Sequence, residues 1–146
     1  MMFDLDGFKA INDRLGHATG DRAIATAAKT ASAATRRGDV IGRWGGDEFV
    51  AVIPNTSREI AATIAERIQV ALERAAADID GRLVGATVST GMAFSSHGAF
   101  ELPAMLLQAD QALYRAKSEG RNRLAMAMPD AAASEIAPIT RHSAAA

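Results

Sequence analysis

Residues 40–53 read Val-Ile-Gly-Arg-Trp-Gly-Gly-Asp-Glu-Phe-Val-Ala-Val-Ile, and this stretch decides the fold. Its two ends, residues 40–44 and 48–53, are rich in the β-branched and aromatic residues that favour strands. Gly45 and Gly46 separate these ends and supply the positive φ angles that a tight hairpin turn needs. The stretch therefore predicts a β-hairpin with two acidic residues, Asp47 and Glu48, directly beside its turn.

Other strands and helices are predicted on both sides of this hairpin. Apolar residues recur at helical spacing at Phe8, Ile11 and Leu15, and again every four residues from Ile60 to Leu72. In chain order, the sequence predicts a strand over 1–5, helices over 8–15 and about 19–37, the hairpin, a helix that contains 60–72 and ends before a turn at 78–81, a strand over 83–94, a helix that contains 102–113 and is capped by Gly120, and a strand over 124–128. This order favours an α/β fold, more narrowly an α+β sandwich, in which helices flank a mostly antiparallel central sheet.

Length and composition indicate one domain and exclude several classes of protein. The chain has 146 residues, 49% of them hydrophobic, which suffices for one core; we assign the domain to residues 1–128 and expect 129–146 to form a disordered tail. A net charge of −1 gives no global attraction to nucleic acid or anionic lipid. Without cysteine there is neither a disulfide nor a thiolate zinc site. No stretch approaches the roughly 20 apolar residues that span a bilayer, so we expect a cytoplasmic protein without a membrane segment.

Three acidic residues lie where strands end or turn. Asp4 comes at the end of the first predicted strand, and Asp47 and Glu48 directly follow the diglycine turn of the hairpin. A central sheet could bring these carboxylates together, and they would repel one another unless a cation neutralised them. Oxygen ligands with room for phosphate suit Mg²⁺ or Mn²⁺. The alternative is that all three are solvated acids of ordinary turns.

Several ordered motifs identify the chain as a member of a known family. They are Gly-Gly-Asp-Glu-Phe at 45–49 after Arg43-Trp44, Phe-Asp-Leu-Asp-Gly-Phe-Lys-Ala-Ile-Asn-Asp at 3–13, Gly16-His17, Gly20-Asp21, Ala-Asp-Gln-Ala-Leu-Tyr-Arg-Ala-Lys at 109–117 and Gly-Arg-Asn-Arg at 120–123. In order and spacing they resemble the GGDEF family of bacterial diguanylate cyclases. The resemblance implies a fold like that of nucleotidyl cyclases and polymerase palm domains. It also implies the condensation of two GTP molecules into cyclic di-GMP, with release of two pyrophosphates.

By this resemblance the acidic residues form a metal site. The side chains of Asp4 and Asp47 and the carbonyl of Leu5 are the implied ligands, Glu48 assists nearby, and two metal ions are the family's usual complement. Their task is to neutralise the triphosphate and to lower the pKa of the attacking 3′-hydroxyl. Asp47 is also the implied general base.

The resemblance assigns Asn12 and Asp21 to the guanine base. Asn12 lies at the edge of the apolar stripe of its helix, so its amide is expected to lean inward and to need a partner. A carboxylate at Asp21 can accept from N1–H and from the exocyclic amine of guanine. From the sequence alone, Asp21 can equally be the N-cap of the following helix.

The phosphates are expected to meet backbone and cationic groups. Gly7, Phe8 and Lys9 open a helix, and free N–H groups at a helix start bind anions. Resemblance assigns Lys117 and Arg121 to the β- and γ-phosphates. The alternative is that both are cations of the kind favoured at any helix C-terminus, or that the lysine snorkels to solvent.

An Arg-x-x-Asp element, Arg36 and Asp39, lies ahead of the hairpin at the separation where the family carries its product-inhibition site. Arginine can pair with phosphate or stack on guanine, and aspartate can accept from the guanine edge. Arg67 matches a position that can supplement this site. The alternative is a surface ion pair.

The resemblance implies a transient homodimer, because one site holds only half of the reacting atoms. Two other functions stay open: a weak or inactive domain that binds GTP or cyclic di-GMP, and a related cyclase with a different product. Family members usually carry a further N-terminal segment before the position of Met1. We therefore expect an N-terminally truncated catalytic domain with reduced stability and activity.

Overall fold

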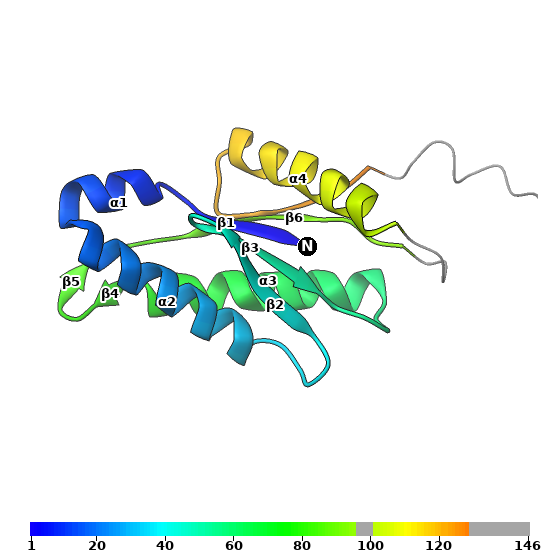
Figure 1. Ribbon diagram of the computed structural model, residues 1–146, viewed down its shortest axis with the longest axis horizontal. Helices are drawn as coiled ribbons and strands as arrows, with labels where there is room; N and C mark the ends of the chain where they lie inside the picture. Colours follow the sequence, from blue (N-terminus) through cyan, green and yellow to red (C-terminus); the bar gives the residue numbers. More distant parts are fainter. Residues whose placement is uncertain (96–100, 129–146) are drawn as a thin grey trace, which may run out of the picture.

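A five-stranded sheet in the order β2–β3–β1–β6–β7 forms the centre of the computed structural model, which describes residues 1–95 and 101–128 (Figure 1). In chain order the elements are β1 (Met2–Leu5), α1 (Phe8–Leu15), α2 (His17–Ala33), β2 (Val40–Gly45), β3 (Glu48–Val52), α3 (Arg58–Ala75), β4 (Asp78–Ile79), β5 (Arg82–Leu83), β6 (Val88–Met92), α4 (Leu102–Ser118) and β7 (Leu124–Met126). Antiparallel pairing joins β1 to β3 and β6, and β2 to β3, whereas β7 runs parallel to β6. The predicted α/β fold with a mostly antiparallel sheet is confirmed. The predicted tail lies outside the described residues.

Helices cover both faces of the sheet, so its central strand β1 is buried on both sides. Helix α4 lies on one face, and α2 and α3 lie on the other (Figure 1). Phe3 and Leu5 belong to the larger core cluster with residues of α2 and α3, whereas Met2 packs with residues of α4. Because side chains alternate along a strand, Asp4 shares the α4 face with Met2. The fold thus places a buried acid under α4.

A glycine brings α4 unusually close to the sheet. A Cβ atom on Gly91 of β6 would lie 2.0 Å from the carbonyl oxygen of Ala109 and 2.2 Å from the backbone nitrogen of Leu113. No side chain fits in that space, so the helix backbone packs directly on the strand. This close approach brings the last turn of α4 near the end of β1.

The expected strand over 83–94 is wrong. The chain instead forms a separate hairpin of β4 and β5, and only Val88–Met92 joins the central sheet as β6. The two-residue turn Asp80-Gly81 has φ angles of 54° and 76°, the left-handed geometry that closes a tight hairpin. Gly85, at φ 66°, then redirects the chain before β6.

Helix α2 is also shifted from the expected 19–37. It begins directly after Gly16 and ends at Ala33, because a new turn follows in which Asp39 accepts from the backbone N–H of Arg36 at 3.0 Å. Within the described part of the chain, none of the helices is long and apolar enough to cross a membrane.

Candidate active site at the end of the central strands

The hairpin and β1 bring the three predicted acids together. In the β1–β3 ladder Asp4 is the Cα partner of Glu48, and the N–H of Leu5 donates to the carbonyl of Asp47 at 3.3 Å. Asp4 is 6% exposed, whereas Asp47 and Glu48 are half-buried at the rim. The interpretation of these residues as separate turn acids is therefore wrong for Asp4, which is a buried group of the sheet.

Burial and charge act together on Asp4. The pKa of Asp4 is raised from 3.8 to about 6, and burial is the main cause; contact with Lys117 opposes the rise, and the nearby charges of Asp47 and Glu48 add to it. The Lys117 ammonium lies 2.9 Å from the Asp4 carboxylate. A charge held out of water beside other carboxylates favours any cation that reaches it.

The donor set fits a magnesium-like ion completed by substrate. In residues 1–95 and 101–128 no three acidic or histidine side chains form a protein-only metal cage. The predicted set is two carboxylates, Asp4 and Asp47, with the Leu5 carbonyl. Mg²⁺ in phosphoryl-transfer sites is typically held by one or two carboxylates together with substrate phosphates. Asp4 is buried beside two other carboxylates, and a cation there would offset their mutual repulsion, which agrees with this set.

Asn12 presents an unsatisfied polar atom beside the start of α2. Its Oδ1 atom is buried without a hydrogen-bond partner. A Cβ atom on Gly20 would lie 1.9 Å from this oxygen, so only glycine leaves room for the amide. The inward lean of Asn12 is confirmed, and such an atom has a large desolvation cost unless a ligand supplies a donor.

Asp21 follows Gly20 and is exposed. It lies inside α2, which begins at His17, so its interpretation as an N-cap is wrong. The fold thus sets an exposed carboxylate one residue from the glycine against which Asn12 packs. Their pairing on a guanine base stays a prediction.

The start of α1 lies directly after the acidic strand. Gly7 is its N-cap at φ 67°, with no side-chain cap, and the first helical hydrogen bond runs from the N–H of Ile11 to the Gly7 carbonyl at 3.1 Å. The N–H groups of Phe8 and Lys9 precede that bond and belong to the open end of the helix. They follow the end of β1 within a few residues of the chain, which is where an anion site near the acids would be needed.

Two cations lie at the C-terminal end of α4. Lys117 lies in the last turn, and its ammonium contacts Asp4 while part of the side chain stays exposed to solvent. Arg121 is exposed and follows Gly120 in a turn, with φ 62°. The structure thus brings Lys117 to the acids and sets Arg121 just beyond the helix end.

Asp6 is a residue of this region that sequence reasoning missed. Its carboxylate accepts from the hydroxyls of Thr87 and Ser89, both at 2.7 Å, and from the backbone N–H of Asn122 at 3.1 Å. Its partners lie 81 to 116 residues away in the chain. The only sequence signal was its place two residues after Asp4 in a strand-to-helix turn.

The residues predicted for product inhibition gather at the end of α2, away from the acids. Arg36 pairs with Asp39 at 3.3 Å and donates to the carbonyls of Pro54 and Asn55 at 2.7 and 3.1 Å. The Arg67 guanidinium donates to the carbonyl of Ala34. The ion pair of Arg36 and Asp39 is therefore present. Arg67 contacts the chain two residues before Arg36, at the C-cap of α2. Whether these groups take a ligand stays a prediction.

Comparisons with known proteins agree with this architecture. The chain is 37% identical over 126 residues to diguanylate cyclase A of Treponema denticola, which covers 86% of this chain and 34% of that protein. It is 41% identical over 124 residues to diguanylate cyclase DgcM of Escherichia coli K12, covering 85% of this chain and 29% of that protein. The chain therefore spans about a third of the length of these curated relatives.

Solved structures give the same result. The GGDEF domain of DgcB from Caulobacter crescentus, in complex with c-di-GMP, matches with a TM-score of 0.79 and 32% identity over 86% of this chain and 75% of that one. The GGDEF domain of YfiN (TpbB) from Pseudomonas aeruginosa matches with a TM-score of 0.79 and 36% identity over 88% and 81%. The family model described as "Diguanylate cyclase, GGDEF domain" matches residues 1–123. The chain belongs to the GGDEF family of diguanylate cyclase domains.

Proposed function

We propose that this chain condenses two GTP molecules into cyclic di-GMP and releases two pyrophosphates. The observation that carries the proposal is the buried Asp4, held beside Asp47 and Glu48 and contacted by Lys117 at 2.9 Å. Acids of this kind with one cation nearby suit a metal-bound triphosphate rather than a neutral ligand. Membership of the family supports the same reaction.

The family is generally metal-dependent, and we propose two Mg²⁺ or Mn²⁺ ions per site. Asp4, Asp47 and the Leu5 carbonyl would hold them, with Glu48 nearby. When bound, the metal supplies charge neutralisation on the triphosphate and acidifies the attacking 3′-hydroxyl. The protein's own share is to fix these oxygens on paired strands before substrate arrives.

The remaining site residues would bind and orient GTP. Asn12 and Asp21 would read the guanine edge, which supplies the donor that the buried Asn12 oxygen needs. The N–H groups at the start of α1, with Lys117 and Arg121, would hold the phosphates. Lys117 would then exchange some of its contact with Asp4 for phosphate oxygens.

Catalysis needs two copies of the chain, because each copy would hold one GTP. In a transient homodimer the 3′-oxygen of each GTP forms a bond to the α-phosphorus of the other, and the bond from that phosphorus to the β-phosphate oxygen breaks. Pyrophosphate leaves, and Asp47 is the proposed acceptor of the hydroxyl proton. The dimer supplies proximity and orientation rather than new chemical groups.

We also propose that the reaction runs in the cytoplasm and that Arg36, Asp39 and Arg67 bind the product as an inhibitor.

Pyrophosphate release from GTP and from ATP tests the substrate assignment. We expect the wild-type chain to prefer GTP and Asp21→Ala to lose most of that preference, because a base-edge acceptor is removed while the phosphate site stays. Asp13→Ala, an exposed acid of α1, is the control. Equal release from the two nucleotides by the wild-type chain would overturn the proposed guanine site.

A further inference from the structure

Asp6 joins three parts of the chain that are distant in sequence. It lies between β1 and α1, two residues after Asp4, and its backbone N–H donates to the carbonyl of Thr87 at 2.9 Å. Its carboxylate accepts from the Thr87 and Ser89 hydroxyls at 2.7 Å and from the N–H of Asn122 at 3.1 Å. The connection that follows Asp4 and Leu5 is therefore tied to the start of β6, through Thr87 and Ser89, and to the turn after α4.

That turn has a strained backbone. Gly120, Arg121 and Asn122 have φ angles of 116°, 62° and 45°, and the N–H of Arg121 donates to the Ala116 carbonyl at 3.0 Å, as in a Schellman helix end. Glycine adopts such angles without strain and asparagine tolerates them, but an arginine in this region is strained. Left-handed residues of this kind persist where surrounding contacts hold them. The turn therefore depends on its neighbours for its shape.

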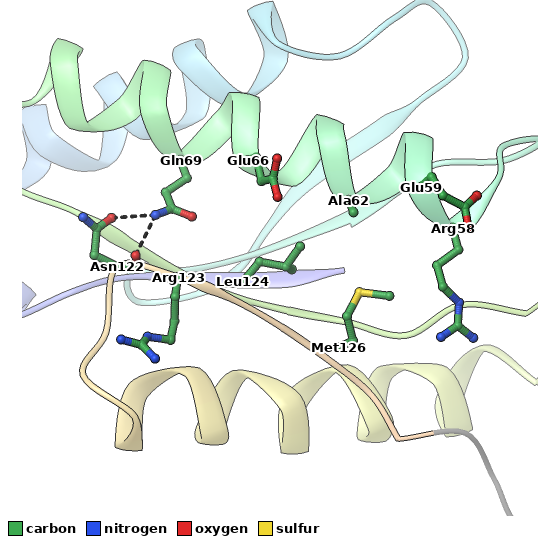
Figure 2. Close-up of a pocket in the computed structure, with 9 residues that line it drawn as sticks. All are labelled: Arg58, Glu59, Ala62, Glu66, Gln69, Asn122, Arg123, Leu124 and Met126. Atoms are coloured by element: carbon green, nitrogen blue, oxygen red, sulfur yellow. Dashed lines mark hydrogen bonds between the residues drawn. The ribbon is translucent and has the colours of Figure 1, made fainter.

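A second contact holds the same turn from α3. The Gln69 amide donates to the Asn122 carbonyl at 2.6 Å and to its side-chain oxygen at 3.0 Å. Figure 2 shows these two bonds crossing from α3 to Asn122, with Arg123 and Leu124 following it in the chain. Asp6 thus fixes the N–H side of Asn122, and Gln69 fixes its carbonyl side.

We infer that Asp6 is a positioning residue that aims Arg121 at the phosphates of a nucleoside triphosphate. By holding the N–H of Asn122, the Asp6 carboxylate sets the strained turn that presents the exposed Arg121. Asp4 and Leu5 end the strand that directly precedes Asp6, so one carboxylate ties the end of β1 to the turn that carries the arginine. A triphosphate that reaches from the end of β1 to Arg121 would then find the two parts of its site at a fixed separation. The inference rests on the proposed function.

A purely structural role for Asp6 makes a different prediction. An anchor that only stabilises the fold would, when weakened, lower affinity for every ligand of the site to a similar degree. A residue that aims Arg121 changes only the part of binding that involves the β- and γ-phosphates. Comparing a triphosphate with GMP separates the two roles, because GMP keeps the base and one phosphate but lacks the groups assigned to Arg121.

The experiment measures binding of a non-cyclisable α,β-methylene GTP analogue and of GMP by calorimetry with Mg²⁺. The variants are Asp6→Asn, Arg121→Ala and the double variant; Asp6→Asn keeps the side-chain shape but replaces one acceptor oxygen by a donor. Gln69→Ala loosens the turn from the other side if Asp6→Asn folds poorly. Gln111→Ala, an exposed glutamine of α4, is the matched control.

We expect Asp6→Asn and Arg121→Ala each to weaken binding of the analogue on the order of tenfold, with GMP affinity changed less than twofold. The double variant should bind no more weakly than Arg121→Ala, because the two residues act through one contact. Equal losses for both nucleotides, or additive losses in the double variant, would overturn the inference.

Amide exchange of Asn122 tests the anchor without nucleotide. Asp6→Asn should speed exchange of the Asn122 N–H, because its acceptor is weakened. Unchanged exchange would overturn the inference even if GTP binding is normal. A wild-type chain that binds neither nucleotide would instead overturn the proposed function, and the phosphate role of Arg121 with it.

Discussion

We expect ionised Asp4 to lower the free energy of unfolding of the metal-free protein at neutral pH. Its pKa is raised from 3.8 to about 6, mainly by burial, with Lys117 opposing the rise and Asp47 and Glu48 adding to it, so the folded state favours the protonated form. Between these two pH values the folded chain binds more protons than the unfolded chain. Stability therefore falls as pH rises through this window, and the full loss is present above it.

The size of the effect follows from the shift. A rise of about 2 pKa units, at 1.36 kcal/mol per unit, corresponds to about 3 kcal/mol. Asp4→Asn keeps the shape of the protonated carboxyl and cannot ionise. We expect it to be about 3 kcal/mol more stable than the wild-type chain near pH 8, and equal to it near pH 4. Lys117, whose side chain is 34% exposed, keeps contact with water when it loses its partner.

Urea unfolding between about pH 4 and pH 8 in a chelating buffer measures this gap. Asp13→Asn, which changes an exposed acid of α1, is the control and should show no gap. Added Mg²⁺ should stabilise the wild-type chain and leave Asp4→Asn unchanged, because binding to the folded state alone raises stability. A gap that does not vary with pH, or an Asp4→Asn variant less stable than wild type near pH 8, would refute the reasoning.

Three further substitutions test other parts of the account. Asp47→Ala should abolish cyclic di-GMP synthesis and change the unfolding free energy by less than about 1 kcal/mol, because a half-buried turn acid is removed; turnover near the wild-type rate would remove Asp47 from the mechanism. Arg36→Ala should relieve inhibition by added cyclic di-GMP without loss of the uninhibited rate, and an unchanged inhibition curve would leave Arg36 and Asp39 as an ion pair only. Gly91→Ala should cost about 3 kcal/mol or more in urea unfolding, because the new Cβ meets the backbone of α4; Gly42→Ala, with open space around its Cβ, should cost far less, and equal losses would contradict the close packing.

Most of the fold could be predicted from the sequence, because most helices, strands and turns depend on residues that are close together in the chain. The four-residue spacing in α3 is of this kind, and so is the diglycine of the hairpin. The prediction of two positive φ angles there was wrong for Gly45, which belongs to β2, and holds only for Gly46, with φ 51°. The strand over 83–94 failed because apolar residues continue across Gly85, where the backbone turns. The spacing of apolar residues does not reveal that the backbone changes direction between two apolar segments.

Site residues could be predicted only where the apolar spacing of their own helix shows which way the side chain points. Helical spacing placed Asn12 inward, and its buried oxygen confirms that placement. Lys117 continued an apolar stripe, and its partner proved to be Asp4. Asp6 could not be found in the same way, because the groups that donate to its carboxylate are the hydroxyls of Thr87 and Ser89 and the backbone N–H of Asn122, and no local pattern connects them.

Identification of the product made from GTP tests the central claim most directly. The purified chain is incubated with GTP and Mg²⁺, with ATP, and with both nucleotides, and the products are separated by chromatography beside an Asp47→Ala control. The account predicts cyclic di-GMP from GTP alone, two pyrophosphates for each molecule formed, and no cyclic product from ATP. Cyclic product containing adenine would contradict the guanine assignment, and bound GTP that is never converted would contradict the proposed enzyme.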